Sequence, residues 1–391
     1  MKYDYKNYIL TNSERKYFGL NPIEESWERV DIKETYTVYF DGDCIRKTIS
    51  FSDADNRIDY QEKDTLIHTK NRQIVLPRTD KGKEKKLNYS SVSTINPSGC
   101  VFSMNLMFDF YGTKYSSNVR ARNNINSLEL PINADNNLAT IKDYKLWLKK
   151  YIESCPKDYF EKVDKMRNNP HKTVKYYNGD IFRFEIDREY YGFGLIMGQI
   201  QKIKKDKIIN DRHAFYSTMT VPLIVRLYKF KTKDKDLAIA NITKNKLLDP
   251  IIMSDNGVIW GSYDIVGNKE LTENDIEFPF HIGESLEKQN YIRLCWGIGC
   301  IVLQKYDKMP NEISNNKYLN HGVVTGINTT NFDRSISNEI EITNGIDEVV
   351  KKVALNYFGL SENISFNEFN LKFNGMTREQ YVNYANKYIR K

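Results

Sequence analysis

The first 138 residues alternate apolar and polar positions with a period close to two, which is typical of β-strands. Residues 35–40 and 44–51 are rich in β-branched and aromatic residues, and Asp41-Gly42 between them predicts a tight hairpin turn. Strand-like runs and turn residues then recur about every 10 residues, which favours a sandwich or a barrel. We therefore predict an all-β domain over residues 1–138, with further strands at 65–69, 72–76, 87–94 and 101–108.

Residues 141–166 change to the period of a helix. Ile141, Tyr144 and Leu148 share one helical face, and Pro156 interrupts the pattern before a second apolar face begins. This pattern predicts a helical hairpin. We interpret residues 139–170 as a helical connector between two domains.

Strand patterns return in the second half of the chain, at residues 180–186, 191–200, 221–229 and 293–303. Two helices are predicted at 346–358 and 377–389, because Gly359 can cap the end of the first and Thr377 the start of the second. Residues 171–391 are thus predicted to form an α+β domain, in which a bent β-sheet or barrel carries peripheral helices. The fold class predicted for the whole chain is α+β, mainly β.

The charge balance limits the kinds of partner. Lys and Arg number 58 against 51 Asp and Glu, a formal net charge of +7, and both signs alternate along both halves of the chain. A polybasic arm that binds nucleic acid or a membrane would concentrate its charge, so this distribution indicates solvated surfaces instead. With 40% hydrophobic residues the chain can bury packed cores, which excludes bulk disorder.

The sequence predicts a cytoplasmic protein with no membrane partner. The start, Met1 to Lys6, has no apolar segment after its charged residues, so it does not look like a secretory signal. The nearest candidate for a membrane span, residues 292–303, is too short and contains Arg293. The five cysteines are scattered, which favours reduced thiols over a disulfide framework or a zinc ribbon.

No local motif indicates enzyme chemistry. The five histidines lie far apart, so no metal site is predicted, and the chain has neither a phosphate-binding loop nor a nucleophile elbow. The glycines of residues 192–198 stand inside a strand pattern with no helix after it, which argues against dinucleotide binding. We therefore predict no catalytic residues and no cofactor. An enzyme whose site is assembled from distant segments stays open as one alternative.

Nucleic acid is not favoured as the partner either. Residues 381–391 mix tyrosines with basic residues, as nucleic-acid-binding segments do. However, Tyr381, Tyr384 and Tyr388 recur at the spacing of a buried helical stripe, which favours packing over binding. A nucleic-acid-associated protein of a mobile element is the other alternative.

The most informative block comprises residues 175–199 and 260–279. It combines a turn and strand of the form Gly-Asp-x-Phe, a returning strand with Tyr-Gly-x-Gly, and a later Trp followed by Ile-Val-Gly-Asn-Lys. This ordered set resembles the immunity protein 26 family over residues 176–303. The positions that carry the resemblance are Gly179, Asp180, Phe182, Gly192, Gly194, Trp260, Ile265 and Gly267.

The resemblance implies an immunity protein of a bacterial polymorphic toxin system. Proteins of this family are encoded beside such toxins and protect the producing cell by binding its own toxin. The implied partner is a cognate protein toxin, which is neutralised by stoichiometric binding and steric block rather than by catalysis. The net charge of +7 argues against mimicry of nucleic acid and for a toxin with a neutral or acidic face.

The shared residues are interpreted as scaffold, namely Gly179, Asp180, Phe182, Gly192, Gly194, Ile265 and Gly267. Tyrosine and tryptophan supply contact area at little entropic cost. The residues predicted to face the toxin are therefore Tyr190, Tyr191, Trp260 and Tyr263. The sequence specifies neither the oligomeric state nor the activity of the toxin.

Overall fold

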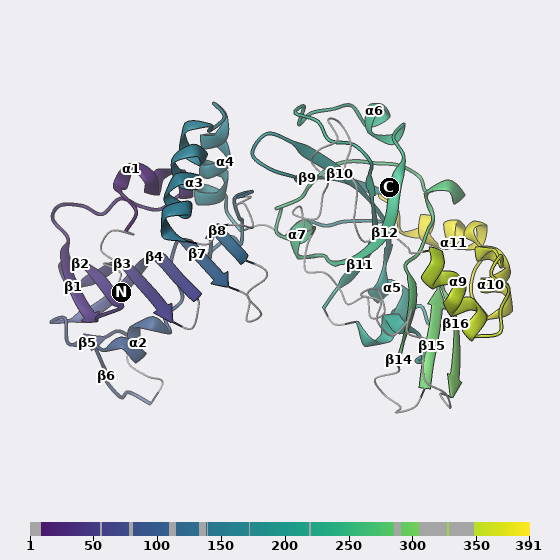
Figure 1. Cartoon of the computed structure of the whole chain (residues 1–391), viewed down its shortest axis with the longest axis horizontal. Coiled ribbons are helices and arrows are strands. Elements are labelled where there is room, and N and C mark those ends of the chain that lie inside the picture. Colours follow the sequence, from purple (N-terminus) through teal and green to yellow (C-terminus); the bar gives the residue numbers. More distant parts are fainter. Residues whose placement is uncertain are drawn as a thin grey trace. The chain divides into compact units, whose positions relative to one another are not determined.

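A computed structural model of the chain describes residues 9–54, 57–77, 81–108, 115–132, 138, 140–171, 173–218, 220–284, 291–304, 327 and 348–391. The chain divides into two compact units, residues 1–172 and 173–391 (Figure 1). Each unit combines antiparallel strands with a few helices, so the predicted class, α+β and mainly β, is confirmed. No helix among these residues is long and apolar enough to cross a membrane, and all five cysteines are free.

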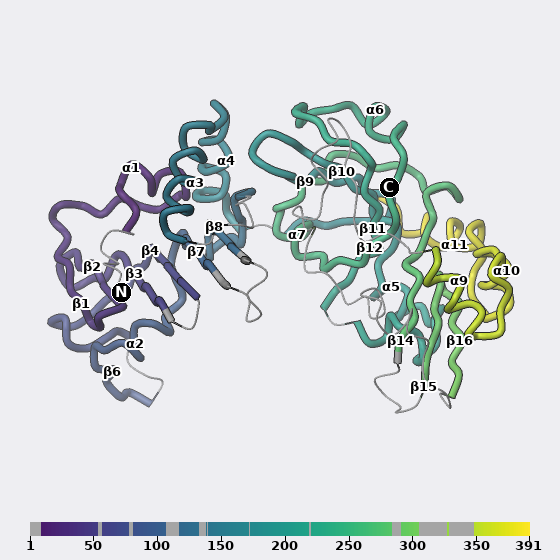
Figure 2. The backbone as a smooth tube through the Cα atoms, in the orientation of Figure 1, coloured from purple at the N-terminus to yellow at the C-terminus, as the bar shows by residue number. Residues whose placement is uncertain are grey.

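The first unit is built on one antiparallel sheet, whose path can be followed in Figure 2. Its main strands run in the order β1 (Glu28–Lys33), β2 (Tyr36–Asp41), β3 (Cys44–Ala54), β4 (Arg57–Lys70), β7 (Cys100–Phe108) and β8 (Tyr115–Asn123), and β4 also pairs with β5 (Ile74–Val75), which pairs with β6 (Lys85–Lys86). The turn predicted at Asp41-Gly42 joins β2 to β3, with Gly42 at a φ of 58°. Over the described residues the strands form one open sheet, so the predicted sandwich or barrel is wrong.

Two helices, α3 (Ile141–Glu153) and α4 (Tyr159–Asn168), complete the core of this unit (Figure 1). Tyr151 of α3 belongs to the same hydrophobic cluster as Phe18 and Phe102, and the ring centroid of Phe18 lies 5.9 Å from Tyr151 and 4.4 Å from Phe102. The predicted helical hairpin is confirmed, but it is not a connector. Its apolar face packs on the sheet, which therefore needs no second sheet to bury its hydrophobic side.

Short helical segments accompany the sheet, namely α1 (Asn12–Arg15), η2 (Lys16–Phe18) and α2 (Tyr89–Ser93). The strand predicted at 87–94 is α2 instead. The side chain of Asn88 accepts a hydrogen bond from the Ser91 N–H, and the Ser91 hydroxyl accepts one from the Asn88 N–H, each at 3.0 Å. This capping box stabilises a helical turn that the alternation of apolar residues did not indicate.

The second unit contains a five-stranded and a three-stranded antiparallel sheet. The five-stranded sheet has the order β12 (Leu247–Ser254), β11 (Pro222–Tyr228), β10 (Tyr191–Gln199), β9 (Asp180–Glu185) and β13 (Asp264–Asn268); the other is β14 (Phe280–Glu284), β15 (Tyr291–Trp296) and β16 (Gly299–Gln304). The strands predicted at 180–186, 191–200 and 221–229 are confirmed, and 293–303 is the β15–β16 hairpin. Both sheets are open over the described residues, so no barrel is present there.

The helices of this unit are α5 (Ile200–Lys205), η3 (Ala214–Ser217), α6 (Ile239–Thr243), α7 (Asn256–Ile259), η4 (Glu273–Asp275), α9 (Glu348–Tyr357), α10 (Phe366–Lys372), α11 (Arg378–Ala385) and η6 (Asn386–Tyr388). One hydrophobic cluster joins the five-stranded sheet to the three-stranded sheet and to α9, α10 and α11. Both predicted C-terminal helices are confirmed, with Gly359 at a φ of 68° and Thr377 as the N-cap of α11. The second ends earlier than predicted, at Ala385, and 346–347 lie outside the described residues.

A buried asparagine joins α10 to the turn between β15 and β16. Asn370 Oδ1 accepts hydrogen bonds from the N–H groups of Ile298 (3.1 Å) and Gly299 (2.8 Å). Its Nδ2 donates to the carbonyl oxygens of Trp296 (3.0 Å) and Phe366 (2.9 Å). Since Asn370 is fully buried, its side chain satisfies four main-chain groups that water cannot reach.

A buried histidine is held in one tautomer by two backbone groups. His213 Nδ1 accepts a hydrogen bond from the N–H of Phe215 (3.1 Å), so the ring proton lies on Nε2, 3.2 Å from the carbonyl oxygen of Gly297. Burial lowers the pKa of His213 from 6.5 to about 3. The imidazole is therefore neutral in the folded protein near neutral pH.

We expect the free energy of unfolding to fall as the pH drops below 6.5. The unfolded chain protonates His213 near pH 6.5, but the folded chain does so only near pH 3, so acid favours the unfolded state over this interval. The loss is about 1.4 kcal/mol per pH unit. Urea unfolding at about pH 7.5 and about pH 5 measures the slope. The variant His213→Gln should show a smaller dependence of stability on pH. The control variant His68→Gln, which alters an exposed histidine, should keep the wild-type dependence. Equal slopes in all three proteins would show that His213 is not the group responsible.

Candidate functional site

The motif glycines and phenylalanines of the second unit lie opposite one another in the β9–β10 hairpin. Gly192 pairs with Phe184, and Gly194 pairs with Phe182. A Cβ atom at Gly192 would lie 2.4 Å from Cζ of Phe184, and one at Gly194 would lie 2.3 Å from Cζ of Phe182. The glycines thus leave open the space that the two rings fill. The ring of Tyr263 stacks on Phe182, with centroids 5.7 Å apart.

The other carried-over positions lie on or beside the same strands. Gly179 has a φ of 79°, and a Cβ there would lie 2.2 Å from the carbonyl oxygen of Lys269, so a larger residue would be both strained and crowded. Ile265 and Gly267 lie on β13, which pairs with β9. The structure therefore brings the predicted scaffold residues together on β10, β9, β13 and the turn before β9.

Asp180 is the fully buried acid of this motif. Its carboxylate accepts hydrogen bonds from the Tyr177 N–H (2.9 Å) and from Asn268 Nδ2 (2.9 Å). Arg390 donates to the same carboxylate, with Nη2 2.8 Å from Oδ2 and Nε 3.1 Å from Oδ1. A buried charge with these partners is fully compensated.

Tyr191, one of the four residues predicted to face a toxin, is buried, so its predicted exposure is wrong. Only 7% of Tyr191 is accessible, and the Arg183 guanidinium lies 5.4 Å from the centre of its ring. The reason is its place on β10, a central strand in which eight of nine residues are buried because both faces are covered. Tyr190, Trp260 and Tyr263 are half-buried.

These four residues do not form a single exposed patch. The ammonium groups of Lys231 and Lys233 lie 5.1 Å and 5.2 Å from the centre of the Tyr190 ring. Tyr263 packs against the phenylalanines of β9, and Trp260 directly follows α7. Tyr190, Trp260 and Tyr263 stay predictions as partner-facing residues, because each keeps part of its surface accessible.

Residues 387–391 lie beside the start of β9. Ile389 forms a parallel bridge with Asn178, and the N–H of Asn178 donates to the carbonyl oxygen of Tyr388 (3.0 Å). Arg390 is held by Asp180, as described above. A residue of the motif thus fixes a segment that is more than 200 positions away in the sequence.

A pocket of about 940 Å³ opens between this segment and the residues that precede β9. We call it the tail pocket. It is lined by residues 173–177, Gln199, Lys202, Asp255, Ile259 and 387–391.

Positive charge dominates the tail pocket, which has five cations and the single carboxylate of Asp255. Arg390 is paired with Asp180, and Lys202 Nζ lies 5.1 Å from the centre of the Tyr388 ring. The three other cations are exposed and form no ion pair with any residue that the structure describes: Lys175, Lys387 and Lys391. The pocket therefore attracts anionic groups.

The carboxylate of the tail pocket already has a partner. The hydroxyl of Tyr176 donates to Asp255 Oδ2 at 2.8 Å, and burial raises the pKa of Asp255. Asp255 forms no ion pair with a lysine that the structure describes, so the exposed lysines of the pocket are not paired with it. The rings of Tyr176, Tyr177 and Tyr388 add contact area beside the charges.

These features define a mainly β unit with an open, positively charged pocket. The sequence model of the family described as Immunity protein 26 matches residues 177–292, which confirms the resemblance over that segment. The match covers β9 to β14, the first residues of β15 and part of the tail pocket, but neither the first unit nor residues 387–391. The comparisons with curated proteins and with solved structures gave no significant match.

Proposed function

We propose that this protein is an immunity protein that neutralises a cognate bacterial toxin by stoichiometric binding. The family match over residues 177–292 carries this proposal. Inhibition is steric and includes no catalytic step, so an interface of ordinary size, about 800 Å² per partner, is sufficient. Binding takes place in the cytoplasm of the producing cell, where the toxin would otherwise act.

The tail pocket is the proposed contact with the toxin, and its occupant is an acidic segment. Lys175, Lys387 and Lys391 supply three exposed charges without an ion pair over the described residues. Complementary charge of this kind accelerates encounter and excludes partners of the wrong sign. Asp180 and Arg390 hold the wall of the pocket in place before binding, which lowers the ordering cost of the interface.

Reversal of the three lysines tests both parts of this proposal. The triple variant Lys175→Glu, Lys387→Glu, Lys391→Glu should bind the toxin encoded beside this chain about 100-fold more weakly, and it should fail to protect cells that express the toxin. The matched control reverses exposed lysines of the same unit outside the pocket, Lys207, Lys244 and Lys372, and should protect fully. Titration calorimetry and survival on co-expression are the measurements.

The possible outcomes separate the two claims. If wild-type protein neither binds nor protects, the immunity function is wrong. If wild type protects and the pocket variant protects equally well, the function stands but the tail pocket is not the contact.

Nucleic acid is a second candidate partner, because the tail pocket combines five cations with tyrosine rings. Phosphates and stacked bases would use the same groups. In that case the wild-type protein should bind single-stranded oligonucleotides with an affinity that falls steeply with salt. A fluorescence anisotropy titration at two salt concentrations decides between this candidate and an acidic protein segment.

A further inference from the structure

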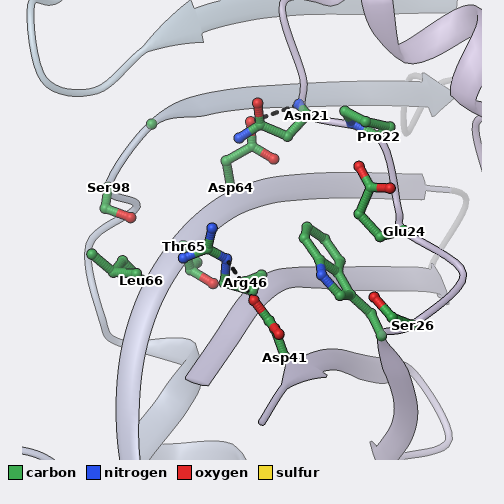
Figure 3. A pocket seen from close by; sticks show the side chains of 12 residues that line it. Asn21, Pro22, Glu24, Ser26, Asp41, Arg46, Asp64, Thr65, Leu66 and Ser98 are labelled. Atoms are coloured by element: carbon green, nitrogen blue, oxygen red, sulfur yellow. Dashed lines mark hydrogen bonds and ion pairs between the residues drawn. The ribbon is translucent and has the colours of Figure 1, made fainter. Parts of the chain in front are cut away.

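The first unit has a pocket of its own, with a volume of about 590 Å³ (Figure 3). We call it the Trp27 pocket. It is lined by Asn21, Pro22, Glu24, Ser26, Trp27, Asp41, Arg46, Asp64, Thr65, Leu66, Ser98 and Gly99. This unit lies outside the segment that matches the immunity family, so a ligand here would be additional to the toxin contact proposed above.

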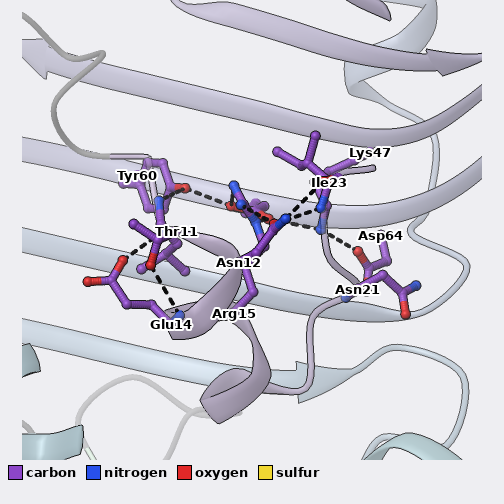
Figure 4. Close-up of polar contacts among 11 residues, drawn as sticks. Thr11, Asn12, Glu14, Arg15, Asn21, Ile23, Lys47, Tyr60 and Asp64 are labelled. Atoms are coloured by element: carbon purple, nitrogen blue, oxygen red, sulfur yellow. Dashed lines mark hydrogen bonds and ion pairs between the residues drawn. The ribbon is translucent and has the colours of Figure 1, made fainter. Parts of the chain in front are cut away.

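Asp64, which lines the Trp27 pocket, belongs to a network of buried charges (Figure 4). Arg15 Nε lies 2.6 Å from Glu62 Oε1, Glu62 Oε1 lies 2.8 Å from Lys47 Nζ, and Lys47 Nζ lies 2.6 Å from Asp64 Oδ1. The second oxygen of Asp64 accepts the N–H of Asn21 at 3.0 Å. Positive and negative groups alternate and are equal in number, so the charge of Asp64 is compensated within the network.

The rim, in contrast, carries negative charge that is not fully compensated. The Glu24 side chain is exposed and has no hydrogen bond or ion pair with the residues that the structure describes. The carboxylate of Asp41 is 55% exposed, and its contact with Arg46 is long, at 3.8 Å. The pocket lining thus includes two exposed carboxylates and one guanidinium, in a protein whose formal net charge is +7.

An aromatic ring lies among these charges. Trp27 lines the pocket together with Glu24, Asp41 and Arg46. Trp27 is half-buried and packs against the core of the unit, so its ring is held in place while part of it stays accessible. A fixed indole beside carboxylates recognises cations through the ring face and through hydrogen bonds to the oxygens.

We propose that the Trp27 pocket binds the arginine side chain of a partner polypeptide. A guanidinium is planar, stacks on an indole and directs several N–H donors to two carboxylates at once, whereas an ammonium is more strongly hydrated and does not stack. The exposed rim residues Glu24 and Ser26 leave the pocket open to solvent, so a side chain can enter while its main chain stays outside.

Peptide titrations on the full chain test this proposal. The probes are acetyl-Gly-Arg-Gly-amide, its lysine and citrulline analogues, and free arginine, and the signal is the indole N–H resonance of Trp27. The arginine peptide should shift this resonance, and the citrulline peptide, which keeps the shape but not the charge, should bind at least about tenfold more weakly. The lysine peptide should be intermediate.

Two variants and a neighbouring control locate the site. Trp27→Leu and Glu24→Gln should each weaken the arginine peptide by about fivefold to tenfold, measured by calorimetry. Glu25→Gln changes an exposed glutamate that does not line the pocket and should leave the affinity unchanged. Because Glu24 is exposed, its variant tests the site even if Trp27→Leu disturbs folding.

Several outcomes would overturn the inference. Equal binding of the citrulline and arginine peptides excludes recognition of charge, and equal binding of the lysine and arginine peptides excludes selection of a guanidinium. Equal binding of free arginine and the peptide identifies a site for a small molecule and not for a polypeptide. The site is absent if the arginine peptide leaves the Trp27 resonance unshifted.

Discussion

Replacing Lys47 by methionine is expected to lower the free energy of unfolding of the first unit by about 3–5 kcal/mol. Lys47 is fully buried between Glu62 and Asp64. Burial alone would raise the pKa of Glu62, but the charges of Lys47 and Arg15 lower it. In the variant Glu62 keeps Arg15, whereas Asp64 is left as a buried carboxylate without a cation. Urea unfolding of the full chain, followed by hydrogen exchange in β3 and β4, measures the change.

Lys70→Met is the matched control, since Lys70 lies on the same strand as Glu62 and Asp64 but is exposed. It should change the free energy of unfolding by less than about 0.5 kcal/mol. A loss of similar size in both variants would show that the buried network contributes no more than any surface lysine.

Replacing Asn370 by leucine is expected to destabilise the second unit by about 4 kcal/mol or more. Each buried polar group that is left without a partner costs about 1–3 kcal/mol, and the variant leaves several. The variant keeps the volume of the side chain but removes four hydrogen bonds to the main chain. The β15–β16 turn and α10 should separate first, because Asn370 is their shared contact. The near-ultraviolet circular dichroism of Trp296 and the urea midpoint report the change.

Asn363→Leu serves as the control, because Asn363 precedes the same helix but is exposed. We expect an effect within about 0.5 kcal/mol. If Asn370→Leu is equally mild, the turn must hold without this side chain and its role in the fold would have been overestimated.

Local signals in the sequence predicted local structure well. Three such signals depend on a few neighbouring residues, and all three features are present in the structure: the Asp41-Gly42 turn, the helix after residue 140 and the helix cap at Thr377. The strand predicted at 87–94 failed because a capping box outweighed the alternation of apolar residues. The helical connector failed because periodicity identifies a helix but not the surface on which it packs.

Contacts between distant segments could not be predicted in this way. Asn370 meets residues 296–299 across more than 70 positions, and Arg390 meets Asp180 across 210. The tail pocket depends on the second of these contacts. In the sequence, the tail pocket was indicated only by the mixture of tyrosines and basic residues at 381–391. The helical spacing correctly predicted that Tyr381 and Tyr384 are buried in the core. Tyr388, the third tyrosine of this spacing, lines the pocket instead.

The burial of Tyr191 could have been inferred from its own strand. Residues 191–197 are almost continuously apolar, a pattern typical of strands covered on both faces. The prediction of Tyr191 as a surface residue used only its aromatic character, which does not distinguish a buried tyrosine from an exposed one.

The pairing of Gly192 with Phe184 and of Gly194 with Phe182 gives the hairpin a built-in register. A shift by two residues would keep the faces of the strands but bring either Phe182 opposite Ile196 or Phe184 opposite Tyr190, where a side chain fills the space that a glycine leaves open. The alignment of β9 and β10 thus does not depend on the turn that joins them. This turn can therefore vary in length and sequence while the sheet beneath it stays the same.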